Sequence, residues 1–242
     1  MKPVLRLVAL LLATAFLLQV FFVGRVALMT LVDPQSTSFQ RSEAWRVTTE
    51  KGSLRWRQQW VPYEQISDHL KRAVIASEDG DFINHDGVEW EAIEKAWQKN
   101  SKAEEQAAKR SQLRATTRPP KIVGGSTITQ QLAKNLLLSG ERTLLRKGQE
   151  FVLTLALELL MSKQRILEIY LNSVEWGEGI FGAEAAAQHY YRKSAAKLTA
   201  YEAARLSVML PRPKYFEKLP NSGYLASRAS TITARMGDAV LP

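Results

Sequence analysis

Near its N-terminus this chain carries an apolar run that is long enough to cross a membrane as a helix. The run extends from Leu7 to Val23 and contains only two polar residues, Thr14 and Gln19. As a helix it spans roughly 25 Å, which is close to the lower limit for the hydrocarbon layer. Lys2 and Arg6 precede it, so the positive-inside rule predicts a cytoplasmic N-terminus with the remainder outside.

A cleavable signal peptide is the alternative interpretation of this run. The small residues at 13–15 could form a cleavage site, but they lie inside the apolar segment rather than after it. We therefore predict that residues 1–33 form a cytoplasmic N-terminus with an uncleaved transmembrane anchor. Residues 34–242 are then expected to form one extracytoplasmic domain.

The composition limits the partners and sites that this domain can have. Of the 242 residues, 45% are hydrophobic, which is sufficient for a single core. The formal net charge of +9 favours an anionic partner, which could be a nucleic acid, a phosphorylated substrate or a lipid surface. The chain has no Cys and three widely spaced His, so disulfides, thiolate metal sites and a local zinc motif are excluded.

Helical periodicity dominates the chain after a polar linker at 33–42, and few alternating strand patterns occur. The first such helix is expected to end near Glu78, with its buried face made by Ile66, Leu70, Ala73 and Val74. The next helix repeats the pattern with Trp90, Ile93 and Trp97. Residues 151–161 are almost wholly apolar, which predicts a helix buried on all sides. The predicted fold class is mostly α.

The helix boundaries farther along the chain are predicted by capping and breaking residues. Gly124 and Gly125 interrupt the chain, and Thr127 with Gln130 three positions later is typical of a capping box. Residues 142–172 carry either one long helix or two in succession. Two more helices are predicted at 183–191 and 198–210, the second stopped by Pro211.

Between about 99 and 121 the core pattern disappears. This segment is polar and basic and ends in two prolines, Pro119 and Pro120. We interpret it as a mobile loop or a weak solvated helix inside the domain, because structured sequence resumes directly after it.

An acidic cluster follows the first core helix and consists of Glu78, Asp79, Asp81 and Asp86. The simplest interpretation is a solvated loop. For the three aspartates this interpretation carries at least as much weight as a functional role. Glu78 differs, because it ends an apolar helix at the terminus where the helix dipole disfavours a carboxylate. Desolvation by the apolar neighbours would also raise its pKa, which suits a general base near neutral pH.

A second cluster gathers cations around Glu150, and its basic members are Lys134, Arg142, Arg146 and Lys147. The Gly-Gly-Ser entry at 124–126 could present free backbone N–H groups to an anion. Ordinary ion pairs along one helix, Lys147 with Glu150 and Arg146 with Glu150, are the alternative. Because Glu150 directly precedes an apolar helix, we expect it to be partly buried within a phosphate-binding pocket.

Three further patterns carry little weight as functional signals. Residues 162–182 include Glu168, Asn172 and three glycines, and structural capping of a helix and turn explains most of them. The Ser-Ala-Ala-Lys at 194–197 matches the serine–lysine pattern of transpeptidases, but the Ser-Asp-Asn and Lys-Thr-Gly elements are missing. The sequence contains no Walker loop and no dinucleotide fingerprint.

Four motifs occur in order along the chain. They are E-D-x-x-F-x-x-H-x-G at 78–87, G-x-S-T-I-T-Q-Q-x-x-K-N at 124–135, R-K-x-x-E at 146–150 and I-L-E-x-Y-L-N at 166–172. With these motifs the chain resembles the peptidoglycan glycosyltransferases of family 51, in their monofunctional, membrane-anchored form. The resemblance covers about residues 60–215. The segment between the first two motifs is longer and more charged than expected for that family.

The resemblance implies a lysozyme-like, mostly α fold with a small lobe against the membrane. It also implies polymerisation of lipid II into β-1,4-linked glycan strands, with inversion and release of undecaprenyl pyrophosphate, on the outer side of a bacterial cytoplasmic membrane. Glu78 would be the general base and Glu150 a second essential acid. Binding of the pyrophosphate would fall to Ser126, Lys134 and Arg142, with Gln130 and Gln131 lining the site. The supporting residues would be Asp79, Phe82, His85, Arg146 and Lys147.

The same resemblance sets the expected partners and cofactors. Lipid II, the growing glycan strand and membrane lipids are the expected partners, along with other cell-wall synthases or divisome proteins. No tightly bound cofactor is expected, and a divalent cation, Mg or Mn, is the one addition considered. Alternatives are a lysozyme-like hydrolase or lytic transglycosylase, and a non-catalytic scaffold for wall assembly. A nucleic-acid partner, suggested by charge alone, is not expected with a membrane anchor.

Overall fold

The computed structural model describes residues 3–113, 125–138, 140–141 and 143–242. It is mostly helical, which confirms the predicted fold class. The helices are α1 (Pro3–Met29), α2 (Ser38–Lys51), α3 (Asp68–Glu78), α4 (Trp90–Leu113), α5 (Ile128–Leu137), α6 (Leu144–Leu160), α7 (Lys163–Ser173), α8 (Ala183–Tyr191), α9 (Ala200–Met209), α10 (Pro213–Glu217) and α11 (Gly223–Arg235). Short 3₁₀ turns occupy Tyr63–Gln65, Ala195–Lys197 and Met236–Asp238.

A small three-stranded sheet lies among these helices. Its strands are β1 (Arg57–Gln58), β2 (Glu175–Gly177) and β3 (Ile180–Phe181), in the order β1-β3-β2. β3 pairs parallel with β1 and antiparallel with β2. The turn between β2 and β3 needs glycine, because Gly179 has φ +71° and an added Cβ would lie 2.0 Å from the carbonyl oxygen of Arg55.

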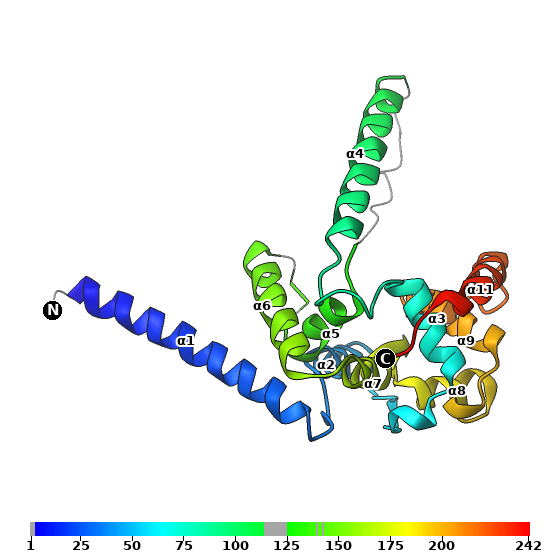
Figure 1. Cartoon of the computed structure of the whole chain (residues 1–242), viewed down its shortest axis with the longest axis horizontal. Helices are drawn as coiled ribbons and strands as arrows, with labels where there is room; N and C mark the ends of the chain where they lie inside the picture. Colours follow the sequence, from blue (N-terminus) through cyan, green and yellow to red (C-terminus); the bar gives the residue numbers. More distant parts are fainter. Residues whose placement is uncertain (1–2, 114–124, 139, 142) are drawn as a thin grey trace.

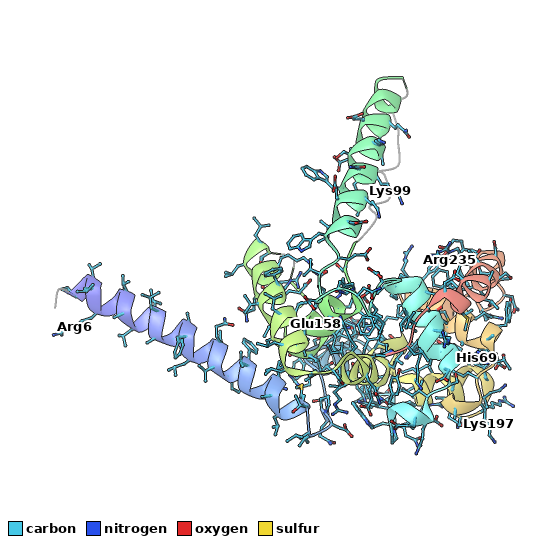
Figure 2. All side chains as sticks on the ribbon, in the orientation of Figure 1. Arg6, His69, Lys99, Glu158, Lys197 and Arg235 are labelled. Atoms are coloured by element: carbon cyan, nitrogen blue, oxygen red, sulfur yellow. The ribbon has the colours of Figure 1, made fainter. Side chains whose placement is uncertain are left out.

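Two long helices leave the main body in different directions, α1 and α4 (Figure 1). α1 is long and apolar enough to cross a membrane, and none of its most apolar stretch is buried. Figure 2 shows Arg6 near the free end of α1. This geometry is compatible with the predicted single-pass anchor.

The main core forms around α3, α7 and α9. α3 starts at the cap Ser67, whose side chain accepts a hydrogen bond from the Leu70 amide, and ends at Glu78 as predicted. The predicted inner face is confirmed, because Ile66, Leu70, Ala73 and Val74 are all at most 1% exposed. This face packs against α9 and α11. Apolar spacing therefore places the end of α3, and with it Glu78, against a rigid core.

The predicted helix boundaries around the second and third motifs are also found. α5 begins with the predicted capping box, in which Thr127 and Gln130 exchange side-chain and backbone hydrogen bonds. Of the two alternatives for 142–172, the structure has two helices, since Ser162 caps α7 directly after α6 ends. α9 ends at Met209, before Pro211.

Two burial predictions are wrong. The segment 151–161 is not enclosed, because one side of α6 exposes Phe151, Val152, Leu155, Leu159 and Leu160. The proposed inner face of α4 is exposed as well, with Trp90 at 68% and Trp97 at 71%. In both cases much of the apolar side stays exposed in the part of the chain that the structure describes, although Trp90 and Phe151 lie close together, with ring centres 6.4 Å apart.

The segment at 99–121 begins as a helix rather than a loop. α4 continues to Leu113, and the side chains described between 99 and 107 are at most half-buried. Up to residue 113 the solvated-helix alternative therefore holds and the mobile-loop alternative does not. Residues 114–121 lie outside the described part of the chain.

Candidate active site

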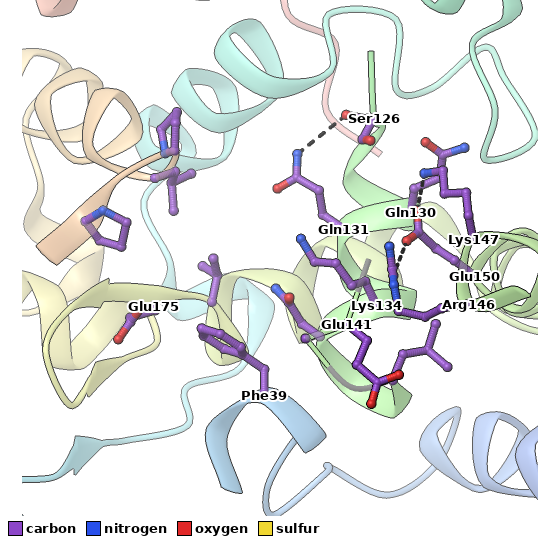
Figure 3. Close-up of a pocket in the computed structure, with 17 residues that line it drawn as sticks. Phe39, Ser126, Gln130, Gln131, Lys134, Glu141, Arg146, Lys147, Glu150 and Glu175 are labelled. Carbon is purple, nitrogen blue, oxygen red and sulfur yellow. Dashed lines mark hydrogen bonds and ion pairs between the residues drawn. The ribbon is translucent and has the colours of Figure 1, made fainter. Parts of the chain in front are cut away.

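A cleft of about 520 Å³ opens between α5, α6 and the turns that follow α7 and α9 (Figure 3). One side is polar and is made mainly by α5 and the first turns of α6. The other side is largely apolar, and its residues are Phe39, Val174, Leu210, Pro211 and Pro213. A cleft with one polar and one apolar wall suits an amphipathic substrate.

The polar wall is built around Glu150. This carboxylate is 3% exposed and contacts both neighbouring cations of its own helix. Arg146 donates from Nη1 to Oε2 at 2.8 Å, and Lys147 pairs with Oε1. Both ion pairs predicted from the spacing are present, and so is the predicted burial. Since both cations also line the cleft, Glu150 holds them at the wall where an anion would bind.

Of the other residues predicted to bind an anion, some line the cleft and one lies outside the described part of the chain. Lys134 and Ser126 are exposed and line the same cleft as Glu150. Gln130 also lines it, but its side-chain oxygen accepts from the Thr127 amide in the capping box. Arg142 lies outside the described residues, so its predicted role stays a prediction.

Glu78 lies beside the cleft and is connected to it through Gln131. Gln131 lines the cleft and donates from Nε2 to Glu78 Oε2 at 3.0 Å. Its Oε1 accepts from the hydroxyl of Tyr170 at 2.9 Å, and Tyr170 is fully buried in α7. The chain Tyr170–Gln131–Glu78 thus fixes the orientation of a partly exposed carboxylate from the protein core.

The surroundings of Glu78 raise the pKa of its carboxyl group. Burial is the largest cause, and the charge of Asp79 adds to it. The hydrogen bonds from Gln131 and Ser77 and the charge of Lys134 act in the opposite direction without cancelling the effect. A carboxyl with a raised pKa accepts protons more readily than an ordinary glutamate, as the sequence predicted for a general base.

Asp79 has a different position from Glu78, although the two are adjacent in the chain. Its side chain is fully buried, with Oδ1 2.8 Å from Nε2 of His85 and Oδ2 accepting from the Ile128 amide at 2.9 Å. Ile128 is the first residue of α5, so Asp79 binds the helix end that leads into the second motif. Asp79 therefore joins two motifs and does not face the cleft.

His85 is held on both sides of its ring. Its Nδ1 accepts from the Gly87 amide at 3.0 Å, which leaves Nε2 to donate to Asp79. Burial lowers the pKa of His85, but the hydrogen bond and charge of Asp79 outweigh burial, and the pKa is raised from 6.5. Phe82 is completely buried beside it, while Asp81 and Asp86 are exposed.

Sequence reasoning missed an ion pair that supports this loop. Lys163 Nζ lies 4.7 Å from the ring centre of Phe82 and donates to the His85 carbonyl and to Glu158. Glu158 Oε1 also accepts from Thr129 of α5. The one available signal was the pair of opposite charges, Glu158 and Lys163, on either side of the Ser162 cap between α6 and α7.

Glu175 on β2 is a second residue that was missed. It lies on the opposite side of the cleft from Glu150 (Figure 3). Burial raises the pKa of Glu175 to about 7, and Lys214 Nζ lies 3.3 Å from its Oε1. The acid follows the fourth motif by three positions, and nothing in its spacing separates it from the surrounding turn.

Comparison with known proteins assigns the chain to a family. The transglycosylase family matches residues 46–237. A biosynthetic peptidoglycan transglycosylase of Paraburkholderia phytofirmans is 54% identical over 224 residues, which cover 93% of this chain and 87% of the relative. A protein of the same description from Bordetella pertussis is 50% identical over 231 residues, covering 96% and 91%.

The chain belongs to the transglycosylase family. Its chemistry is therefore glycosyl transfer, and the lysozyme-like fold class expected from the motifs is confirmed. All four motifs of this transglycosylase lie inside the matched region. The roles of the individual site residues stay predictions, since the comparisons assign no residue.

The donor atoms of the transglycosylase cleft do not fit a divalent cation as they are arranged. Each carboxylate oxygen of Glu150 is occupied by a cationic side chain, and Glu78 is bound by Gln131. Among the described residues no group of three or more His, Asp or Glu could hold a metal.

Proposed function

We propose that this transglycosylase polymerises lipid II into β-1,4-linked glycan strands and releases undecaprenyl pyrophosphate. The observation that carries the proposal is the pairing of one base-like carboxyl, Glu78, with a separate cationic wall around Glu150 in the same site region. Relatives at about half identity or more are described as biosynthetic peptidoglycan transglycosylases, which supports this substrate class.

In the proposed reaction Glu78 acts on the acceptor sugar. Its carboxylate takes the proton from the 4-hydroxyl of an incoming lipid II, and that oxygen attacks the anomeric carbon of the donor strand. The bond from this carbon to the pyrophosphate breaks with inversion, so an α-linked donor yields a β link. Gln131 keeps the carboxylate oriented during the transfer.

The cationic wall acts on the leaving group. A pyrophosphate already leaves readily, so it needs stabilisation of negative charge more than full protonation. Arg146 and Lys147, held by Glu150, and Lys134 on α5 supply that charge at one wall of the cleft. The two ion pairs of Glu150 favour orientation of these cations as its role.

The substrate's lipid tail is consistent with the position of α1. We propose that α1 anchors the enzyme in the bacterial cytoplasmic membrane with the cleft on the outer side. α1 packs against α6, whose other side exposes large apolar residues, so the cleft would open near the lipid surface. We also propose contacts with other cell-wall synthases or divisome proteins. For these contacts the support is the family resemblance alone.

The direct test is incubation of the full-length purified protein with labelled lipid II in detergent. The proposal expects a ladder of glycan strands and the release of undecaprenyl pyrophosphate in equal molar amount to the bonds formed. A lysozyme-like hydrolase or lytic transglycosylase would instead leave lipid II intact and digest finished cell wall. Digestion of wall without polymer formation would therefore overturn the proposal.

The rate should depend on pH through Glu78. A base must be deprotonated, and the raised pKa of Glu78 means that activity increases with pH over a range above the ordinary value of 4.5. The charge of Lys134 lowers the pKa of Glu78, so Lys134→Met is expected to move this acidic limb to higher pH. The measurement is kcat/KM for polymerisation across pH.

Arg228→Met is the matched control for this pH profile, because Arg228 is an exposed cation on α11. It should leave the acidic limb unchanged. An unshifted limb in Lys134→Met, with an overall lower rate, would show that Lys134 acts only on the leaving group.

The exposed lysines of α4 should matter on membranes. Lys99 and Lys102 are exposed, and each cation close to an anionic surface contributes about 1 kcal/mol of attraction. Lys99→Gln combined with Lys102→Gln is expected to lower activity several-fold in anionic vesicles and little in detergent. Arg228→Gln is again the control, and an equal loss in both settings would contradict membrane contact by α4.

A further inference from the structure

We propose that Gln19 and Gln149 form an intramolecular link that fixes the membrane helix α1 against α6 and thereby positions Glu150. The proposal rests on the proposed function, because its catalytic consequence assumes that Glu150 organises the leaving-group site. The contact itself can be tested without any assay of activity.

The face of α1 that meets the rest of the protein is a regular seam. Its members are Gln19, Phe22, Val26 and Met29, spaced by three, four and three residues. Val26 and Met29 are buried in the core, and Phe22 packs against it. The positions before Gln19 are exposed along the described part of α1. Gln19 is thus the outermost member of a helix–helix seam of coiled-coil type.

The side-chain amides of the two glutamines form a reciprocal pair of hydrogen bonds. Gln19 donates from Nε2 to Gln149 Oε1 at 2.8 Å, and Gln149 donates from Nε2 to Gln19 Oε1 at 3.0 Å. Both side chains are partly buried, and Gln19 is one of only two polar residues in the apolar run from Leu7 to Val23. In an apolar medium such a reciprocal amide pair has few alternative partners, so it favours one rotation and one depth of α1 against α6.

A second contact fixes the other end of the same seam. Arg165 of α7 donates from Nε to the Met29 carbonyl at 3.0 Å and pairs with Asp33 at 2.8 Å. Gln19 and Met29 are about 15 Å apart along a helix. Two polar attachments at that separation, with apolar side chains between them, define the direction of α1 relative to the catalytic domain.

The link lies directly beside the site. Gln149 precedes Glu150 in α6, and Glu150 holds Arg146 and Lys147 at the cleft wall. A change in the α1 contact at Gln149 is therefore transmitted through one peptide unit to the carboxylate that orients both cations. Gln19 and Gln149 are positioning residues, since neither lines the cleft.

The first test uses leucine substitutions in the full-length protein in lipid nanodiscs. Gln19→Leu and Gln149→Leu should each lower kcat about five-fold with little change in KM, because each leaves one amide unpaired near Glu150. The double variant should lose no more than either single one, since both polar groups are then absent. Thr14→Leu is the control, because the Thr14 hydroxyl bonds only within α1.

A purely structural role would lower the melting temperature and the active fraction, which also lowers the apparent kcat. The kcat is therefore calculated per folded molecule, and a loss that disappears after this correction would overturn the proposal. Additive losses in the double variant, or wild-type kcat in both single variants, would overturn the proposal. An inactive wild-type protein would instead overturn the proposed function and leave the link to be judged by the second test.

The second test uses the absence of native cysteine. Gln19→Cys combined with Gln149→Cys should form an intramolecular product with a short bismaleimide reagent in membranes, identified by peptide mass spectrometry. Thr14→Cys combined with Gln149→Cys should not. A product between two chains, or equal yields from both pairs, would contradict the link.

Discussion

Glu78→Gln is expected to lower the rate of glycan polymerisation by roughly 10²- to 10⁴-fold, the usual contribution of a positioned general base. The amide has nearly the shape of the carboxyl group and can still bond to Gln131, which donates to Glu78 in the wild type. It cannot accept the acceptor's proton. The loss should therefore appear in kcat, measured as initial rate on labelled lipid II.

Asp86→Asn is the matched control for Glu78→Gln. Asp86 belongs to the same acidic cluster but is exposed, so its rate and melting temperature should stay close to those of the wild type. The Glu78→Gln protein should also keep its melting temperature. Near-normal polymerisation by Glu78→Gln would overturn the role assigned to this residue.

Local signals predicted much of the fold around this base. The face of α3 and the end of that helix follow from apolar spacing, and the capping box of α5 follows from Thr127 and Gln130. These features depend on residues within a few positions of one another, so a single sequence contains the necessary information.

The exposure of α4 and α6 could not be predicted in the same way. The apolar spacing of Trp90, Ile93 and Trp97 shows that the helix has one apolar face. It does not show whether protein or lipid covers that face. Residues 151–161 were predicted to be enclosed for the same reason. The sequence signals for a nearby lipid surface were the apolar run from Leu7 to Val23 and the net charge of +9, and neither identifies which helix faces lipid.

The side-chain hydrogen bonds within the site could not be predicted from the sequence either. The link from Tyr170 through Gln131 to Glu78 joins three segments that are distant in sequence, and side-chain hydrogen bonds of this kind leave no periodic pattern. The partners of Glu150, by contrast, lie three and four residues away on one helix turn and were predicted.

Asp79→Ala is expected to destabilise the protein by about 3–5 kcal/mol, the usual cost of breaking a buried pair by removing one partner. The substitution leaves the Ile128 amide and Nε2 of His85 without the acceptor that both use. It also removes negative charge from the N-terminal end of α5. Urea unfolding of the full-length protein in detergent measures the change.

Asp81→Ala controls for the loss of an acid from the same loop. Asp81 is exposed and bonds to Asn84, so its removal should change the free energy of unfolding by about 0.5 kcal/mol or less. If Asp79→Ala were equally mild, the buried contacts of Asp79 would not hold the two motifs together.

The effect of Asp79→Ala on the free energy of unfolding should also depend on pH. Asp79 raises the pKa of His85 in the folded protein, so protonation of His85 adds stability that is complete below the ordinary value of 6.5 and lost as pH rises through the raised pKa. The difference in unfolding free energy between wild type and Asp79→Ala should therefore be larger below pH 6.5 than above the raised pKa. A difference independent of pH would mean that the Ile128 amide, rather than His85, accounts for the loss.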